Sequence, residues 1–215
     1  MAKKLYWQNV EDIKLLCDVL KKNEVAISST DTIYGFLGNV SKESWNKINE
    51  LKEADKKRPF LILVYSLTNL TNFVDVSAIP EKTIRFISFC WPGPVTFIFN
   101  AKKDLPQFLY SKKGTVALRC PDHEGLQRVL HEFDGLFSTS ANKSMETPPH
   151  MFDQISPDLL KQVSCVIVDE KESEVEKAST LIDLSDPDNT KDFPFEIVRE
   201  GAYCKSKLQE IYHRA

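Results

Sequence analysis

The chain has 215 residues, of which 42% are hydrophobic and 27% charged, a composition typical of a soluble globular protein with a sizeable core. Its formal net charge is −3 and its isoelectric point about 5.9, which argues against a nucleic-acid binder held by bulk charge. The N-terminus lacks the apolar core of a secretory signal, and no apolar run is long enough to span a membrane. We therefore expect a cytoplasmic protein that does not bind membranes.

The cysteines and histidines indicate neither a disulfide framework nor a zinc site. Five cysteines are scattered singly without a C-x-x-C pair, which is typical of reduced cytosolic thiols. The four histidines show no H-x-x-x-H or H-E-x-x-H spacing, so we expect no metal site built by the protein alone.

The first quarter of the chain predicts a helix, a strand and a second helix. Asn9 is a suitable N-cap, and apolar residues from Ile13 to Leu20 recur at helical spacing. The apolar run 25–28 indicates a strand. Ser41 is placed to cap a second helix, with Lys52 near its carboxyl end.

The remaining elements continue this alternation. Strands are predicted at residues 60–65, 95–99, 115–119, 136–138, 165–168, 181–184 and 196–199, and helices at 80–90, 125–133, 157–163 and 205–212. The Glu- and Lys-rich stretch 169–177 is expected to be a solvated loop or a mobile flap and not a domain linker, because strand-like sequence resumes at Thr180. The pattern favours an α/β or mixed sheet flanked by helices, in a single domain over residues 1–215.

Two loops rich in hydroxyl groups follow predicted strands. Residues 29–35 read Ser-Thr-Asp-Thr-Ile-Tyr-Gly, and residues 138–142 read Ser-Thr-Ser-Ala-Asn. Because open α/β sheets bind ligands beyond the carboxyl ends of their strands, both loops can converge on one polar ligand. Taken singly, each loop fits an ordinary Asx or ST turn or a helix cap equally well.

Dispersed cations point to an anionic ligand, although the chain has no P-loop, dinucleotide-binding turn or nucleophile elbow. Hydroxyls and backbone N–H groups in tight loops can cradle phosphate or carboxylate oxygens, and Lys and Arg supply the charge that a polyphosphate requires. A nucleoside triphosphate with a small carboxylated co-substrate would use such a set, here Thr30, Thr32, Lys52, Lys56, Arg58, Arg119, Ser138, Ser140 and Arg199. The run 52–58 alone fits a solvated charged turn, and Asp122 and His123 fit a surface turn better than an acid–base pair.

The ordered set of motifs resembles the YrdC-like family, which includes the threonylcarbamoyl-adenylate synthases. The resemblance covers about residues 10–203. It rests on residues 29–35, Lys52, and the segments Trp-Pro-Gly-Pro-Val-Thr (91–96), Val-Ala-Leu-Arg-Cys-Pro (116–121), Ser-Thr-Ser-Ala-Asn (138–142), Ser-Thr-Leu-Ile-Asp (179–183) and Ile-Val-Arg-Glu-Gly (197–201).

The resemblance implies a twisted mixed sheet flanked by helices around a deep, concave, electropositive pocket. It further implies a nucleotidyltransferase that combines ATP, L-threonine and bicarbonate, with Mg²⁺, into threonylcarbamoyl-adenylate and pyrophosphate. A separate transferase complex would then place the threonylcarbamoyl group on adenosine 37 of tRNA.

The resemblance also implies roles for individual residues. Thr30, Thr32 and Tyr34 would line the threonine side of the pocket, and Lys52 and Arg119 would be catalytic. The expected ATP contacts are Lys52, Arg58, Arg119, Ser138, Ser140, Asn142, Ser179 and Arg199.

Three positions depart from the family pattern and leave alternatives open. Ala54 stands where synthases have the arginine of a Lys-x-Arg motif, Ser29 replaces a proline, and Met145 replaces a glycine. Either Arg58 or the lysines at 56 and 57 would have to supply the missing charge. The charged loop resembles the YciO-like branch, so a paralogue that binds nucleotide or RNA with weak or no synthase activity is the alternative. A module that binds double-stranded RNA is a third interpretation.

Overall fold

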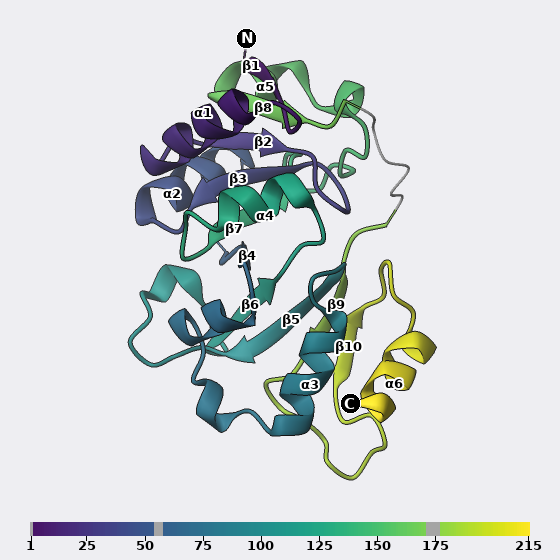
Figure 1. The fold of residues 1–215 in the computed structure, drawn as a ribbon. Helices are drawn as coiled ribbons and strands as arrows, with labels where there is room; N and C mark the ends of the chain where they lie inside the picture. The colour runs from purple at the N-terminus through teal and green to yellow at the C-terminus, as the bar shows by residue number, and fades with distance from the viewer. Residues whose placement is uncertain (1, 54–57, 171–176) are drawn as a thin grey trace.

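The computed structural model describes residues 2–53, 58–170 and 177–215, in which strands and helices alternate along the chain (Figure 1). The strands are β1 (Lys3–Tyr6), β2 (Ala26–Ser28), β3 (Gly35–Asn39), β4 (Leu61–Leu63), β5 (Val95–Asn100), β6 (Thr115–Arg119), β7 (Leu136–Ser140), β8 (Cys165–Val168), β9 (Thr180–Asp183) and β10 (Glu196–Arg199). The helices are α1 (Val10–Lys21), α2 (Lys42–Leu51), α3 (Glu81–Cys90), α4 (Glu124–Leu130), α5 (Pro157–Gln162) and α6 (Lys205–Arg214). Short 3-10 turns are η1 (Leu67–Asn72), η2 (Val76–Ala78), η3 (Gln107–Leu109) and η4 (Phe152–Gln154).

Within these residues the strands form a 10-stranded mixed sheet in the order β1-β8-β2-β3-β7-β4-β6-β5-β9-β10. The pairs β1–β8, β2–β8, β4–β6 and β5–β9 are parallel, and the other neighbours are antiparallel. The predicted mixed α/β sheet flanked by helices is therefore confirmed.

Helices cover both faces of the sheet because side chains alternate along its strands. Ala26 and Leu37 join an apolar cluster with α1 and α4 on one face. Their neighbours Ile27 and Phe36 join a second cluster, with α2, α3 and α6, on the other face. The core thus lies on both sides of the sheet, and strand ends are left to carry polar groups.

The two helix caps expected from the sequence are confirmed. Asn9 Oδ1 accepts a hydrogen bond from the Glu11 N–H (2.9 Å) at the start of α1, and Ser41 Oγ accepts one from the Ser44 N–H (3.1 Å) at the start of α2. These bonds satisfy N–H groups that the first helical turn leaves without intrahelical partners. No helix in the described ranges is long and apolar enough to cross a bilayer.

Three features of the sheet differ from the sequence prediction. Strand β1 was not predicted, because only Leu5 of its four residues is buried and two others are lysines. Strand β3 was not predicted either, because its two glycines resemble turn residues. Strand β7 continues to Ser140, so Ser138 and Ser140 lie on a strand that pairs with β3 rather than in a loop.

Candidate functional site

The predicted site residues gather where several strands end. The carboxyl ends of β2, β6, β7 and β10 and the amino ends of β3 and β9 contribute to a cavity of about 260 Å³. Of the predicted residues, the cavity wall includes Thr30, Thr32, Arg119, Ser138, Ser140, Ser179 and Arg199. Strands far apart in sequence therefore bring hydroxyls and guanidinium groups together, as the sequence argument required.

The loop between β2 and β3 is held by its own hydroxyl groups. Thr30 Oγ1 donates to the Ile33 carbonyl (2.8 Å) and accepts from the Thr32 N–H (3.0 Å). The hydroxyls of Thr30 and Thr32 are 3.0 Å apart. This is the local turn chemistry that these residues favour, and here it also presents both hydroxyls to the cavity.

Arg119 is the buried cation of the cavity. Its side chain is 4% exposed, its Nη1 donates to Thr32 Oγ1 (3.0 Å), and its Nη2 pairs with Asp31 Oδ1. Burial lowers the pKa of Arg119, an effect that Asp31 opposes. Among the described residues the buried Nε–H has no hydrogen-bond partner, although a buried donor normally has one. The hydrogen bonding of this buried guanidinium is therefore incomplete within the described part of the chain.

Asp31 is a site residue that the sequence reasoning did not single out. Its Oδ2 accepts from the Asp122 N–H (3.0 Å), while Oδ1 holds Arg119. The carboxylate thus compensates the buried guanidinium and ties the loop after β2 to the segment after β6. No sequence signal reveals this pair, because its members are 88 positions apart.

Lys52, at the end of α2, faces the backbone behind the cavity wall. Its Nζ donates to the carbonyls of Ser140 (2.8 Å) and Asn142 (2.9 Å). Burial lowers its pKa to about 8. Lys52 is absent from the described cavity wall, so in this structure its charge supports the loop after β7 instead of facing open space.

Asn142 likewise supports the loop that follows β7. Its Nδ2 donates to the carbonyls of Lys143 (3.0 Å) and Glu146 (2.6 Å), and its buried Oδ1 has no partner within the described part of the chain. Met145 in this loop has a φ of 74°, the left-handed region that favours glycine. The backbone therefore keeps a glycine-like conformation where the resemblance led us to expect glycine.

Ser179 and Arg199 close the side of the cavity formed by β9 and β10. Ser179 Oγ lies 2.8 Å from Thr96 Oγ1, and Arg199 Nη2 donates to the Ser179 carbonyl (2.9 Å). Arg199 is exposed and Ser179 is buried. The guanidinium of Arg199 thus lies at the rim, with donors remaining for a ligand.

The other predicted residues lie beside the cavity or outside it. Tyr34 lines a small adjoining recess with Thr30, Thr32 and Asp169. Arg58 is exposed and absent from the described cavity wall, while positions 54, 56 and 57 fall outside the described residues. His123, expected in a surface turn, is instead a largely buried N-cap of α4: its Nδ1 accepts from the Leu126 N–H (3.1 Å).

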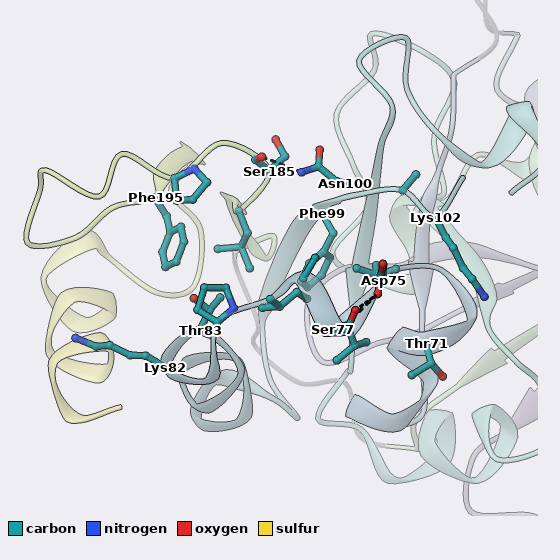
Figure 2. Close-up of a pocket in the computed structure, with 18 of the residues that line it drawn as sticks. Thr71, Asp75, Ser77, Lys82, Thr83, Phe99, Asn100, Lys102, Ser185 and Phe195 are labelled. Carbon is teal, nitrogen blue, oxygen red and sulfur yellow. Dashed lines mark hydrogen bonds between the residues drawn. The ribbon is translucent and has the colours of Figure 1, made fainter. Parts of the chain in front are cut away.

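A larger cavity of about 900 Å³ lies elsewhere, between the start of α3, the end of β5 and the chain around β9 and β10. Figure 2 shows Phe99 and Phe195 in its wall and Ser77 bonded to Asp75. None of the predicted site residues lines it. We therefore assign the candidate site to the smaller cavity, because cations and hydroxyls converge there, and not to the larger cavity on the basis of size.

Comparisons with known proteins agree with this assignment of fold. A family model for Sua5, YciO and YrdC proteins, described as "Telomere recombination", matches residues 18–201. The crystal structure of P. abyssi Sua5 complexed with L-threonine has a TM-score of 0.84 at 23% identity, covering 98% of this chain and 60% of that chain. The crystal structure of E. coli YciO has a TM-score of 0.78 at 22% identity, covering 97% of this chain and 100% of that chain.

Curated relatives share one name. The threonylcarbamoyl-AMP synthase of Pyrococcus abyssi (strain GE5 / Orsay) is 25% identical over 201 residues, which are 93% of this chain and 56% of that protein. This chain therefore spans little more than half the length of that relative. The threonylcarbamoyl-AMP synthase of Histophilus somni (strain 2336) is 27% identical over 193 residues, which are 88% of this chain and 100% of that protein.

Proposed function

This chain belongs to the Sua5/YciO/YrdC family, and we propose that it is a threonylcarbamoyl-AMP synthase. Its substrates would be ATP, L-threonine and bicarbonate, and its products threonylcarbamoyl-AMP and pyrophosphate. The observation that carries the proposal is the buried guanidinium of Arg119 in the wall of a cavity that Thr30, Thr32, Ser138, Ser140 and Ser179 also line.

The proposed chemistry uses substrate atoms for every bond that changes. Bicarbonate takes up a proton and releases water to give carbon dioxide. The ammonium group of threonine loses one proton to become a free amine, which forms an N–C bond with carbon dioxide and loses a second proton, giving a carbamate. A carbamate oxygen then attacks the α-phosphorus of ATP, and the bond from that phosphorus to the pyrophosphate oxygen breaks. Such a reaction needs alignment and charge neutralisation more than a protein nucleophile.

The residues around the cavity suit those two tasks. Arg119, whose charge Asp31 balances, would orient the phosphate or carboxylate from the cavity wall, and Arg199 would add positive charge at the rim. The hydroxyls of Thr30 and Thr32, with Tyr34 in the adjoining recess, would bind the threonine side. Ser138, Ser140 and Ser179 would add neutral donors along the nucleotide. Lys52 and Asn142 would act on the nucleotide by holding the loop after β7 in place.

Magnesium would reach the site bound to the triphosphate of ATP. In the part of the chain that the structure describes, no group of three or more His, Cys, Asp or Glu residues is placed to hold a metal ion. Downstream, a transferase that acts on tRNA would consume the threonylcarbamoyl-AMP. Binding of double-stranded RNA and a cytoplasmic location remain predictions from the sequence.

The test incubates the pure chain with ATP, Mg²⁺, bicarbonate and labelled threonine, against a heat-killed control. We expect labelled threonylcarbamoyl-AMP and an equal amount of pyrophosphate. Tight ATP binding without threonine-dependent pyrophosphate release would instead support the nucleotide-binding alternative. Ala54→Arg separates the two further: if the missing arginine limits activity, the rate rises in this variant while ATP affinity changes little.

A further inference from the structure

A partly buried polar network adjoins the candidate site without belonging to the residues assigned above. Asp169, just after β8, accepts from Ser29 Oγ (2.8 Å) and lies 3.2 Å from His123 Nε2, both through its Oδ2. Trp7 Nε1 donates to Ser29 Oγ (2.9 Å). Ser29 and His123 therefore meet at one carboxylate oxygen of Asp169, and Trp7 joins the network through Ser29.

The donor and the acceptor of each hydrogen bond in this network can be assigned, and both bonds to Asp169 are donated to its carboxylate. The indole N–H of Trp7 can only donate, so the single hydroxyl proton of Ser29 is directed to Asp169. His123 Nδ1 accepts from the Leu126 N–H, so in the neutral imidazole the proton is on Nε2 and is donated to Asp169. Asp169 is thus the common acceptor of both hydrogen bonds.

The two donors lie next to residues that shape the cavity. Ser29 directly precedes Thr30, and the Ser29 N–H continues the sheet by donating to the Ile167 carbonyl (3.0 Å). His123 directly follows Asp122, whose N–H holds the Asp31 carboxylate against Arg119. Asp169 itself lines the recess with Thr30, Thr32 and Tyr34.

We propose that Asp169 is a positioning residue, which fixes the threonine-binding loop 29–34 by accepting from Ser29 and His123 together. This inference rests on the proposed function for the identity of the substrate. Acting through Ser29, the carboxylate sets where the Thr30 and Thr32 hydroxyls lie. Acting through His123, it holds the segment that orients Asp31. The expected consequence is selective: threonine binding depends on Asp169 more than ATP binding does.

The experiment compares Asp169→Ala and Asp169→Asn with a matched control, Asp183→Ala. Asp183 also accepts from a serine, Ser185 Oγ at 2.6 Å, and it ends β9 away from the cavity. Two readouts are measured on the full chain: KM for threonine and for ATP in pyrophosphate release, and amide hydrogen exchange over residues 29–34 and 122–126.

We expect Asp169→Ala to raise KM for threonine at least tenfold and KM for ATP less than threefold. Exchange in both segments should become at least fivefold faster. Asp169→Asn keeps an acceptor oxygen and should recover part of both effects, and Asp183→Ala should show neither. Equal rises in both KM values, unchanged exchange, or the same changes in Asp183→Ala would overturn the inference. A wild-type chain without pyrophosphate release refutes the proposed function, and the exchange data then decide separately whether Asp169 holds the loop.

Discussion

Lys52 places a proton-dependent charge beside the candidate site. Its pKa is lowered to about 8 because burial disfavours the ammonium form. Below pH 8 the charged group donates to the carbonyls of Ser140 and Asn142, and above it the neutral amine loses positive charge. We therefore expect the wild-type rate of pyrophosphate release to fall as pH rises through 8. In Lys52→Arg the guanidinium keeps its charge to above about pH 12, so this fall should disappear even if the rate is lower overall.

The comparison depends on the shape of the pH profile. Carbon dioxide and bicarbonate also interconvert with pH, but they do so identically for both proteins when total bicarbonate is fixed. An alkaline fall with the same midpoint in wild type and Lys52→Arg would show that another group titrates.

Met145 tests whether the loop after β7 is strained. It has a φ of 74° and a fully exposed side chain, so no packing opposes its replacement. Met145→Gly should raise the free energy of unfolding by about 0.5–1 kcal/mol, because glycine adopts this conformation without steric cost. Urea unfolding measures the change. Met151→Gly is the control: Met151 is also exposed, but its φ is −122°. Met151→Gly should leave the free energy of unfolding unchanged or lower it. If both variants raise it, backbone strain at Met145 is not the cause.

At the scale of elements, the sequence predicted best those that bury a regular apolar pattern. Helices α1 and α3 and strand β5 show such patterns and were found close to their predicted bounds. Strand β3 was not predicted, and it contains Gly38, a residue type that is uncommon inside strands. In the structure a Cβ at Gly38 would lie 3.1 Å from side-chain atoms of Ile48 and Ser44, so this glycine lets α2 pack closely on the strand. Packing between elements of this kind cannot be read from local sequence.

The candidate site was predictable only in part, for the same reason. Hydroxyls after strand ends and an arginine at the end of β6 follow local patterns, and the structure brings them to one cavity. The acceptors that hold these side chains do not follow local patterns. Asp31 and Asp169 gain their roles from partners 88 and 140 positions away, respectively, so a single sequence gives no signal for those roles.

Helix α4 packs closely against Trp7, and a substitution in this helix tests whether that close packing stabilises the fold. A Cβ on Gly125 would lie 2.4 Å from the ring of Trp7, a separation that real Cβ atoms essentially never show. Gly125→Ala should therefore push α4 from the sheet and lower the free energy of unfolding by about 1–3 kcal/mol. Tryptophan fluorescence and urea unfolding measure both effects.

Gly114→Ala is the matched control for that substitution. Gly114 has a φ of 75°, but a Cβ there meets nothing within 4 Å. Its replacement should cost only about 1 kcal/mol of backbone strain and leave the Trp7 fluorescence unchanged. If the two variants lose equal stability and neither alters fluorescence, close packing of α4 on Trp7 is not the cause.

On the scale of the whole molecule, the cavity joins the two halves of the sheet. Its wall takes Thr32 and Ser140 from the side of β2, β3 and β7, and Arg119, Ser179 and Arg199 from the side of β6, β9 and β10. A ligand that touches both sets links the halves, and a ligand that binds only the folded chain stabilises it. The acidic net charge does not prevent anion binding, because fields within clefts depend on nearby charges.

Arg199 allows this linkage to be tested without disturbing the core, because it is exposed and, among the described residues, its side chain hydrogen-bonds to Ser179. Arg199→Ala should weaken ATP binding about tenfold, the low end for a charge-assisted hydrogen bond at an exposed rim. Without ligand its melting temperature should match wild type, but the rise caused by saturating ATP should shrink. Calorimetric titration and thermal unfolding measure the two quantities. Arg214→Ala removes another exposed arginine, at the end of α6, which is absent from the described cavity wall, and should change neither quantity. If Arg199→Ala binds ATP as tightly as wild type, the nucleotide does not reach β10, and the cavity binds its ligand through Arg119 and the hydroxyl loops alone.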